Sequence, residues 1–101
     1  MKPGDIVITA FAGAQSAKTR PAVVLSTTLY HDHRPDVILG LITSKQIDPL
    51  CPTDYEIRDW RAAHLNAPST FRLYVSTRFR RDVYVVGRLV ETDWQEIRKS
   101  D

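Results

Sequence analysis

Cysteine, long apolar runs and a strong net charge are all scarce or missing in this chain of 101 residues. The one cysteine, Cys51, excludes an intramolecular disulfide bond and is typical of a protein in a reducing cytosol. No apolar run approaches the roughly 20 residues of a membrane-spanning helix, and residues 1–5 lack the apolar core of a signal peptide. We therefore expect a cytoplasmic protein that makes no contact with a membrane.

The composition is that of an ordinary globular protein. Hydrophobic residues make up 43% of the chain and charged residues 26%, so we expect a single domain over residues 1–101 with one core. The net charge of +2 and the pI near 8.9 permit a nucleic-acid partner without requiring one. Basic and aromatic residues gather in the last third of the chain: Arg72, Tyr74, Arg78, Phe79, Arg80, Arg81, Tyr84 and Arg88.

Short apolar stretches between turn-forming residues predict a mainly β protein. Strands are expected at residues 6–8, 21–26, 36–44, 54–57, 69–75 and 83–90. Residues 22–25 are apolar throughout, which predicts burial on both faces, and Gly40 indicates a bulge or a close backbone approach. Alternation in the fifth strand predicts that Phe71, Leu73 and Val75 share one face. A long loop of small residues is expected at residues 11–19 and a polar connection at residues 27–35.

Two helices are expected near the end of the chain. The first covers residues 59–65 with Asp59 as its N-cap, and the second runs from Asp93 to about Lys99 behind a capping box at residues 92–95. Several short strands with one short and one terminal helix predict a strongly bent antiparallel sheet. Closure into a small barrel removes the exposed edges of such a sheet.

Residues 18–26 (KTRPAVVLS) bring a cationic pair to the start of a predicted strand. Pro21 fixes its own φ and favours an extended Arg20. The guanidinium of Arg20 offers a planar fork of donors that never deprotonates, which suits a phosphate. The alternative is that Lys18 and Arg20 are solvated loop charges.

Several segments in a fixed order resemble the MazF/PemK family of type II toxin–antitoxin systems. They are residues 3–7 (PGDIV), 18–26 (KTRPAVVLS), 41–44 (LITS), 54–60 (DYEIRDW) and 87–89 (GRL), with Leu65, Pro68-Ser69 and Arg72, and they cover nearly the whole chain. The resemblance implies an SH3-like small barrel of the MazF/Kid (CcdB-like) type, usually a homodimer. It further implies a metal-independent, sequence-selective endoribonuclease for single-stranded RNA that is neutralised by a cognate antitoxin protein.

The same resemblance places the family's arginine on Arg20 and its threonine on Thr43. Arg20 would stabilise charge on the phosphoryl oxygens, and Thr43 would hydrogen-bond a phosphate oxygen or orient the attacking 2′-hydroxyl. The products would carry 2′,3′-cyclic phosphate and 5′-hydroxyl ends, with no cofactor and no metal. The expected substrate contacts are Gln15, Lys18, Ser44, Arg72 and Arg80. The resemblance assigns no general base.

Plainer interpretations remain for most of these residues. Thr43 and Ser44 can satisfy strand-end backbone groups. Arginines in the last third can line a solvated strand face, although with the aromatics between them they also suit single-stranded RNA. Trp60 and Trp94 are expected as core or dimer-interface anchors, and Cys51 as a packing or loop residue.

Histidines offer two further hypotheses. His31 and His33 share a face if residues 31–33 are extended, so they could bind a metal or supply a base, although an exposed connection is the simpler interpretation. His64 is expected at the surface or at a helix end.

Two other functions compete with the nuclease. One is a barrel that binds RNA or protein without cleavage, and the other is a toxin that acts on a protein target, as CcdB-type barrels do on gyrase.

Overall fold

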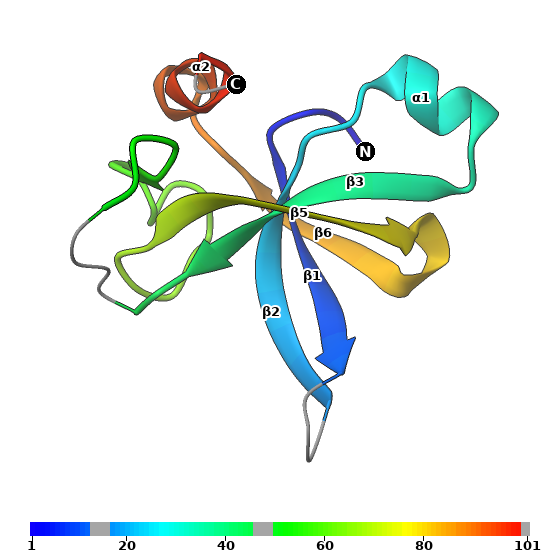
Figure 1. Cartoon of the computed structure of the whole chain (residues 1–101), viewed down its shortest axis with the longest axis horizontal. Helices are drawn as coiled ribbons and strands as arrows, with labels where there is room; N and C mark the ends of the chain where they lie inside the picture. The colour runs from blue at the N-terminus through cyan, green and yellow to red at the C-terminus, as the bar shows by residue number, and fades with distance from the viewer. Residues whose placement is uncertain (13–16, 46–49, 100–101) are drawn as a thin grey trace.

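The computed structural model describes residues 1–12, 17–45 and 50–99, without the side chains of residues 10–18. One antiparallel sheet holds all six strands in the order β4-β5-β3-β2-β1-β6 (Figure 1). This mainly β architecture with a short helix and a C-terminal helix confirms the predicted class. The elements are β1 Asp5–Ala12, β2 Ala17–Val24, α1 Thr28–His33, β3 Asp36–Thr43, β4 Tyr55–Glu56, β5 Thr70–Phe79, the 3-10 helix η1 Arg80–Asp82, β6 Val83–Arg88 and α2 Glu91–Arg98.

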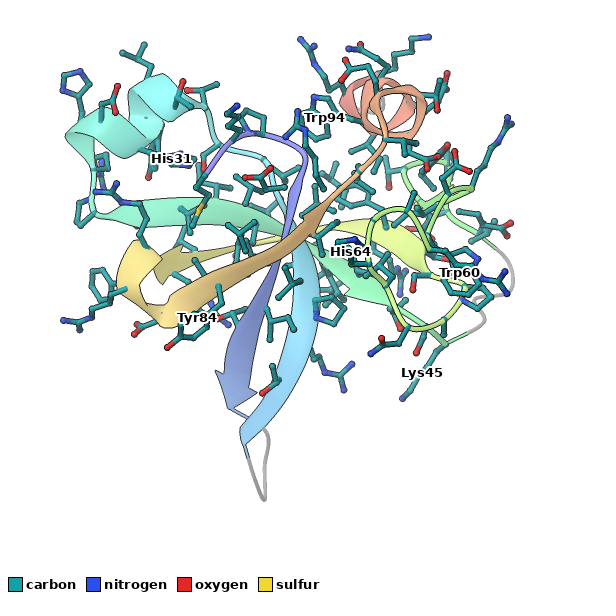
Figure 2. All side chains as sticks on the ribbon, turned by 180° about the vertical axis from the view of Figure 1, so that it is seen from behind. His31, Lys45, Trp60, His64, Tyr84 and Trp94 are labelled. Carbon is teal, nitrogen blue, oxygen red and sulfur yellow. The ribbon has the colours of Figure 1, made fainter. Side chains whose placement is uncertain are left out.

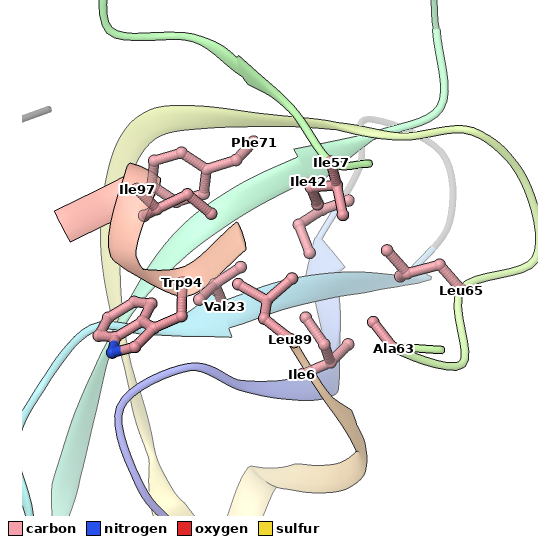
Figure 3. Close-up of a cluster of buried hydrophobic side chains, with 10 residues drawn as sticks. All are labelled: Ile6, Val23, Ile42, Ile57, Ala63, Leu65, Phe71, Leu89, Trp94 and Ile97. Atoms are coloured by element: carbon pink, nitrogen blue, oxygen red, sulfur yellow. The ribbon is translucent and has the colours of Figure 1, made fainter. Parts of the chain in front are cut away.

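The centre of the sheet is buried on both faces. Ile6 pairs with Val23, and the next pair along β1 and β2 is Val7 with Ala22. Because neighbouring strand residues point to opposite faces, the first pair joins one hydrophobic cluster and the second pair joins another. The first cluster lies under α2 and includes Trp94 (Figure 3). The predicted two-sided burial of the run that begins at residue 22 is confirmed for residues 22–24.

The predicted loop at residues 11–19 is mostly strand. β1 extends to Ala12 and β2 begins at Ala17, and residues 13–16 lie outside the description. Arg20 therefore lies within a strand, opposite Thr9, rather than where a loop enters one. The prediction failed because the first half of β2 is polar and carries no apolar run.

The predicted connection at residues 27–35 contains the helix α1. The Thr27 hydroxyl caps it by accepting the backbone N–H of Tyr30 at 3.2 Å. On a helix, His31 and His33 project about 200° apart, so their predicted convergence on one face is wrong. Among the described residues no group of three or more histidine, cysteine or acidic side chains is placed to hold a metal ion.

β5 contains a bulge that its sequence alternation did not reveal. Gly40 pairs with Val75 while the next residue of β3, Leu41, pairs with Arg72, so residues 73–74 have no partner. The three side chains of residues 73–75 are exposed. Phe71 and Leu73 line one cavity whereas Val75 lines another, so the predicted shared face does not extend to Val75. The close approach predicted at Gly40 is confirmed, since a Cβ there would lie 2.4 Å from the ring of Phe71.

The C-terminal helix α2 starts two residues earlier than predicted, at Glu91. Its N-cap is Val90, which has no side chain that could cap, so the predicted capping box is wrong. Asp93 instead turns its carboxylate into the protein, where it is fully buried. Neither α1 nor α2 is long and apolar enough to cross a membrane, and the rest of the described chain contains no helix that is.

Candidate functional site

A cavity opens where β2 and β3 separate. The two strands pair only from Ala22–Leu41 to Val24–Leu39, because the other half of β2 continues with β1 as a two-stranded ribbon (Figure 1). The space between the ribbon and the end of β3 is a cavity of about 340 Å³. Its polar lining residues are Thr19, Arg20, Thr43, Ser44, His64, Asn66 and Ser69.

Arg20 is the cation of this cavity. Its backbone is fixed by the ladder between β1 and β2, and its side chain is half-buried. Several other arginines in the described chain are paired with carboxylates, as Arg88 is with Asp5 at 2.9 Å and Arg72 is with Asp54 at 3.3 Å. Within that same part of the chain, the guanidinium of Arg20 has neither a hydrogen bond nor an ion pair. Its donors are therefore available to an anion that enters the cavity.

Thr43 and Ser44 lie at the end of β3 beside Arg20. The Thr43 side chain is almost completely buried, and its Oγ1 accepts the backbone N–H of Lys45 at 3.2 Å. The strand-end role considered for this hydroxyl is thus real. Its own O–H remains free to donate, so the same group can also bind an oxygen of a ligand. Ser44 is exposed at the cavity wall.

Residues 57–65 form the wall opposite β3, and α2 holds them in place. The buried carboxylate of Asp93 accepts the backbone N–H groups of Arg58 and Asp59, at 3.2 and 2.9 Å, and the hydroxyl of Tyr55. Burial raises the pKa of the Tyr55 phenol, and the hydrogen bond to Asp93 raises it further. The two backbone N–H groups that donate to this fully buried carboxylate fix the start of the segment.

The segment ends in a turn rather than the predicted helix. The N–H of Leu65 bonds the carbonyl of Trp60 and the N–H of His64 bonds that of Arg61, both at 3.0 Å. His64 itself has φ of +65°, in the left-handed region. This pair of hydrogen bonds forms the Schellman motif that ends many helices. His64 occupies the position of the motif at which glycine is usual. Residues 58–64 are consecutive turns as a result, and Asp59 caps no helix.

His64 is a site residue that sequence reasoning missed. It is exposed, as the sequence predicted (Figure 2), but it also lines the cavity that Arg20 lines, which the sequence did not indicate. Its Nδ1 lies 2.9 Å from the carbonyl oxygen of Val86 in β6. The backbones at Ala63 and Gly87 lie close together, since a Cβ on Gly87 would lie 2.2 Å from the oxygen of Ala63. Only the folded chain brings these groups together, so no local pattern in the sequence could reveal them.

Of the other predicted contact residues, Arg72 and Arg80 do not line the cavity. Arg72 is turned toward Asp54, with 3.3 Å between Nε and Oδ1. Arg80 belongs to η1, where it lines a separate shallow cavity with its neighbours. Gln15 and the side chain of Lys18 lie outside the described residues. RNA contacts by these four residues remain predictions.

The tryptophans serve the core. Trp94 is buried in the cluster beneath α2, and Trp60 packs against that cluster while the Arg61 guanidinium lies 4.9 Å from its ring centre (Figures 2 and 3). Cys51 is exposed in the connection before β4, as expected for a loop residue.

Comparisons with known proteins agree with this architecture. Solved structures similar to the chain include a mycobacterial endoribonuclease in complex with its cognate antitoxin (TM-score 0.76, 14% identity, 99% of this chain and 89% of that one). The MazE–MazF structure from Deinococcus radiodurans is also similar (TM-score 0.75, 19% identity, 98% of this chain and 90% of that one). So is the Mycobacterium tuberculosis toxin MazF-mt6 (TM-score 0.72, 20% identity, 95% of this chain and 90% of that one). At these identities the likeness establishes the fold, and it confirms the MazF type.

The comparison with curated protein sequences found no match. A sequence profile described as the PemK-like, MazF-like toxin of type II toxin–antitoxin systems matches residues 2–100. The chain therefore belongs to the PemK-like, MazF-like toxin family.

Proposed function

We propose that this protein is a toxin that cleaves single-stranded RNA, including mRNA, at selected sequences without a metal ion. The observation that carries the proposal is the cavity between β2 and β3, lined by Arg20, Thr43 and Ser44, in which no described residue forms a hydrogen bond or ion pair with the Arg20 guanidinium. Family membership over residues 2–100 supports it. So does the likeness to a structure described as an endoribonuclease bound to its antitoxin.

RNA carries its own nucleophile, so the cavity needs no nucleophilic side chain. Attack of the 2′-hydroxyl on the adjacent phosphorus gives a 2′,3′-cyclic phosphate and a 5′-hydroxyl end. Negative charge builds on the phosphoryl oxygens during this attack. Arg20 and the free O–H of Thr43 are donors suited to that charge. One well-placed donor of this kind contributes about 2.7–4 kcal/mol to the transition state.

Two protein partners belong to the proposal: a cognate antitoxin and a second copy of the chain. β5 and β6 expose large side chains that a lone small protein does not need: Tyr74, Val75, Phe79, Tyr84 and Val85, each at least half exposed (Tyr84 is labelled in Figure 2). Exposed apolar and aromatic groups on neighbouring elements are typical of a protein contact surface. A toxin acting on mRNA would work in the cytoplasm.

Cleavage of a long single-stranded RNA by the purified protein in the presence of EDTA tests the proposal. We expect discrete cuts with 5′-hydroxyl ends, and a rate that falls by about 10²–10³-fold in Arg20→Ala, because the donor to the phosphoryl oxygens is lost. Arg98→Ala is the matched control, since Arg98 is exposed on α2 away from the cavity. It should cut like the wild type.

Intact RNA from folded wild-type protein, over diverse substrates, would contradict the proposal. Growth inhibition that persists without any RNA cleavage would then indicate a protein target. RNA binding without cleavage would indicate a binding barrel.

A further inference from the structure

His64 occupies a backbone position that most side chains avoid. Its φ of +65° lies in the left-handed region, where non-glycine residues are uncommon and asparagine, aspartate and histidine are the usual exceptions. The surrounding structure holds it there through the two Schellman hydrogen bonds, the close fit of Ala63 on Gly87 and the Asp93 anchor. Backbone strain that is fixed from several sides in this way is characteristic of functional positions.

The hydrogen bond at Nδ1 of His64 determines which ring nitrogen of the imidazole carries the proton. A carbonyl oxygen only accepts, so the Nδ1 that lies 2.9 Å from the Val86 oxygen carries the proton. In the neutral ring, Nε2 is then the nitrogen with the lone pair. Across the residues described, Nε2 has no hydrogen-bond partner, and the side chain is exposed on the lining of the cavity.

No other side chain on the described lining of this cavity can act as a base near neutral pH. The lining contains no aspartate, glutamate, lysine or cysteine, and its one other charged group is Arg20, which does not deprotonate. The charged residues with described side chains on β2, on β6 and on the segment that contains His64 are Arg20, Arg88, Arg58, Asp59 and Arg61. Arg88 is already paired with a carboxylate at the start of β1.

We propose that His64 is the general base of the RNA cleavage, an inference that rests on the function proposed above. Nε2 takes the proton of the 2′-hydroxyl as the O2′–P bond forms. The P–O5′ bond then breaks, and the 5′-oxygen takes a proton from water. The imidazolium returns its proton to the solvent, so the whole reaction consumes none. Arg20 and Thr43 hold the phosphoryl oxygens while this proton moves.

His64→Asn is the central test, because asparagine tolerates the left-handed backbone and its amide N–H can replace the bond to Val86. The variant should fold, yet it has no group that accepts a proton near neutral pH. We expect cleavage to slow by about 10²-fold or more. The wild-type rate should fall as the pH drops from 8 to 5, and this acid limb should disappear in the variant.

His64→Gly gives an independent readout. Glycine is the residue usually found at this position of a Schellman turn, so the fold should persist. Removal of the side chain leaves room for a small base, and added imidazole should restore part of the lost rate. A purely structural role for His64 would give no such rescue. His33→Asn is the matched control, since His33 is exposed on α1, and it should cut at the wild-type rate.

The outcomes separate the two proposals. Wild-type cleavage with an unchanged rate and pH profile in folded His64→Asn and His64→Gly would overturn the role of His64 and leave the nuclease intact. Loss of rate in both variants without imidazole rescue and with the acid limb retained would also overturn it. Absence of cleavage by the folded wild type would overturn both proposals.

Discussion

The sheet carries a buried polar anchor at each of its two helices, and the anchors differ in what they hold. Beside α1, the Ser26 hydroxyl accepts the N–H of Ile38 at 3.0 Å and contacts Nε2 of His31 at 2.6 Å, while the other ring nitrogen of His31 is buried without a partner. Beside α2, Asp93 is fully satisfied by three donors. The first anchor attaches α1 to β3, whereas the second positions a wall of the cavity.

The two histidines show the same contrast (Figure 2). His31 is buried and hydrogen-bonded to its own neighbourhood, so it is inaccessible to a substrate. His64 is exposed in a turn, its backbone is held in a left-handed conformation, and its ring is hydrogen-bonded to Val86 of β6. Changes at the α1 anchor should therefore affect stability alone, whereas changes at the α2 anchor should affect stability and cleavage together.

Asp93→Ala should show the largest effect of the anchor substitutions. It leaves two backbone N–H groups and the Tyr55 hydroxyl without their acceptor, and each unsatisfied buried group costs about 1–3 kcal/mol. We expect the free energy of unfolding, measured with urea, to fall by about 3 kcal/mol or more. Cleavage per folded molecule should fall as well, because residues 57–65 lose their attachment.

Asp93→Asn is the control, since its amide oxygen still accepts and the loss of stability should be smaller. A change below about 1 kcal/mol in Asp93→Ala would show that the carboxylate does not hold this segment.

Ser26→Ala should have an intermediate effect and only on stability. It leaves the Ile38 N–H and the His31 ring without their partner, at a cost of about 1–3 kcal/mol in the free energy of unfolding. Cleavage per folded molecule should match that of the wild type, because α1 lies away from the cavity. The exposed Thr28→Ala on the same helix provides the matched control for urea unfolding. A selective loss of cleavage in Ser26→Ala would remove the contrast between the two anchors.

Much of the sheet could be predicted because its strands are apolar where they are buried. Residues 22–24 are buried on both faces, and this requires an uninterrupted apolar run that is visible in the sequence. The early half of β2 and the helix α1 are polar and partly exposed, so they carried no such signal. Gly40 was informative since its lack of a Cβ reflects a contact with Phe71.

The candidate site was predictable only in part. Arg20, Thr43 and Ser44 fall in segments that resemble the family, and the structure brings them to one cavity. His64 could not be found this way. The backbone conformation of His64 depends on hydrogen bonds within its own turn. The orientation of its imidazole depends on the carbonyl of Val86, which is distant in sequence. A glycine at residue 64 would have indicated a turn, whereas a histidine there conceals it.

The smallest expected effect is the alkaline sensitivity of two tyrosines, one bonded to the Asp93 anchor and one on α1. Burial and the hydrogen bond to Asp93 raise the pKa of Tyr55, and the hydrogen bond to Asp36 raises the pKa of Tyr30 on α1. A tyrosine in the unfolded chain loses its proton near pH 10, so above that pH the unfolded state binds fewer protons than the folded state. The stabilisation that these two phenols contribute is therefore fully present below pH 10, and the free energy of unfolding falls as the pH rises beyond it. Urea unfolding between pH 8 and 11 measures this fall in the free energy of unfolding. The fall should be shallower in Tyr55→Phe than in the wild type. In Tyr30→Phe it should be closer to that of the wild type, because solvent screens the more open Tyr30 pair.

An equal dependence of the free energy of unfolding on pH in Tyr55→Phe and the wild type would mean that the Asp93 anchor does not hold the Tyr55 proton.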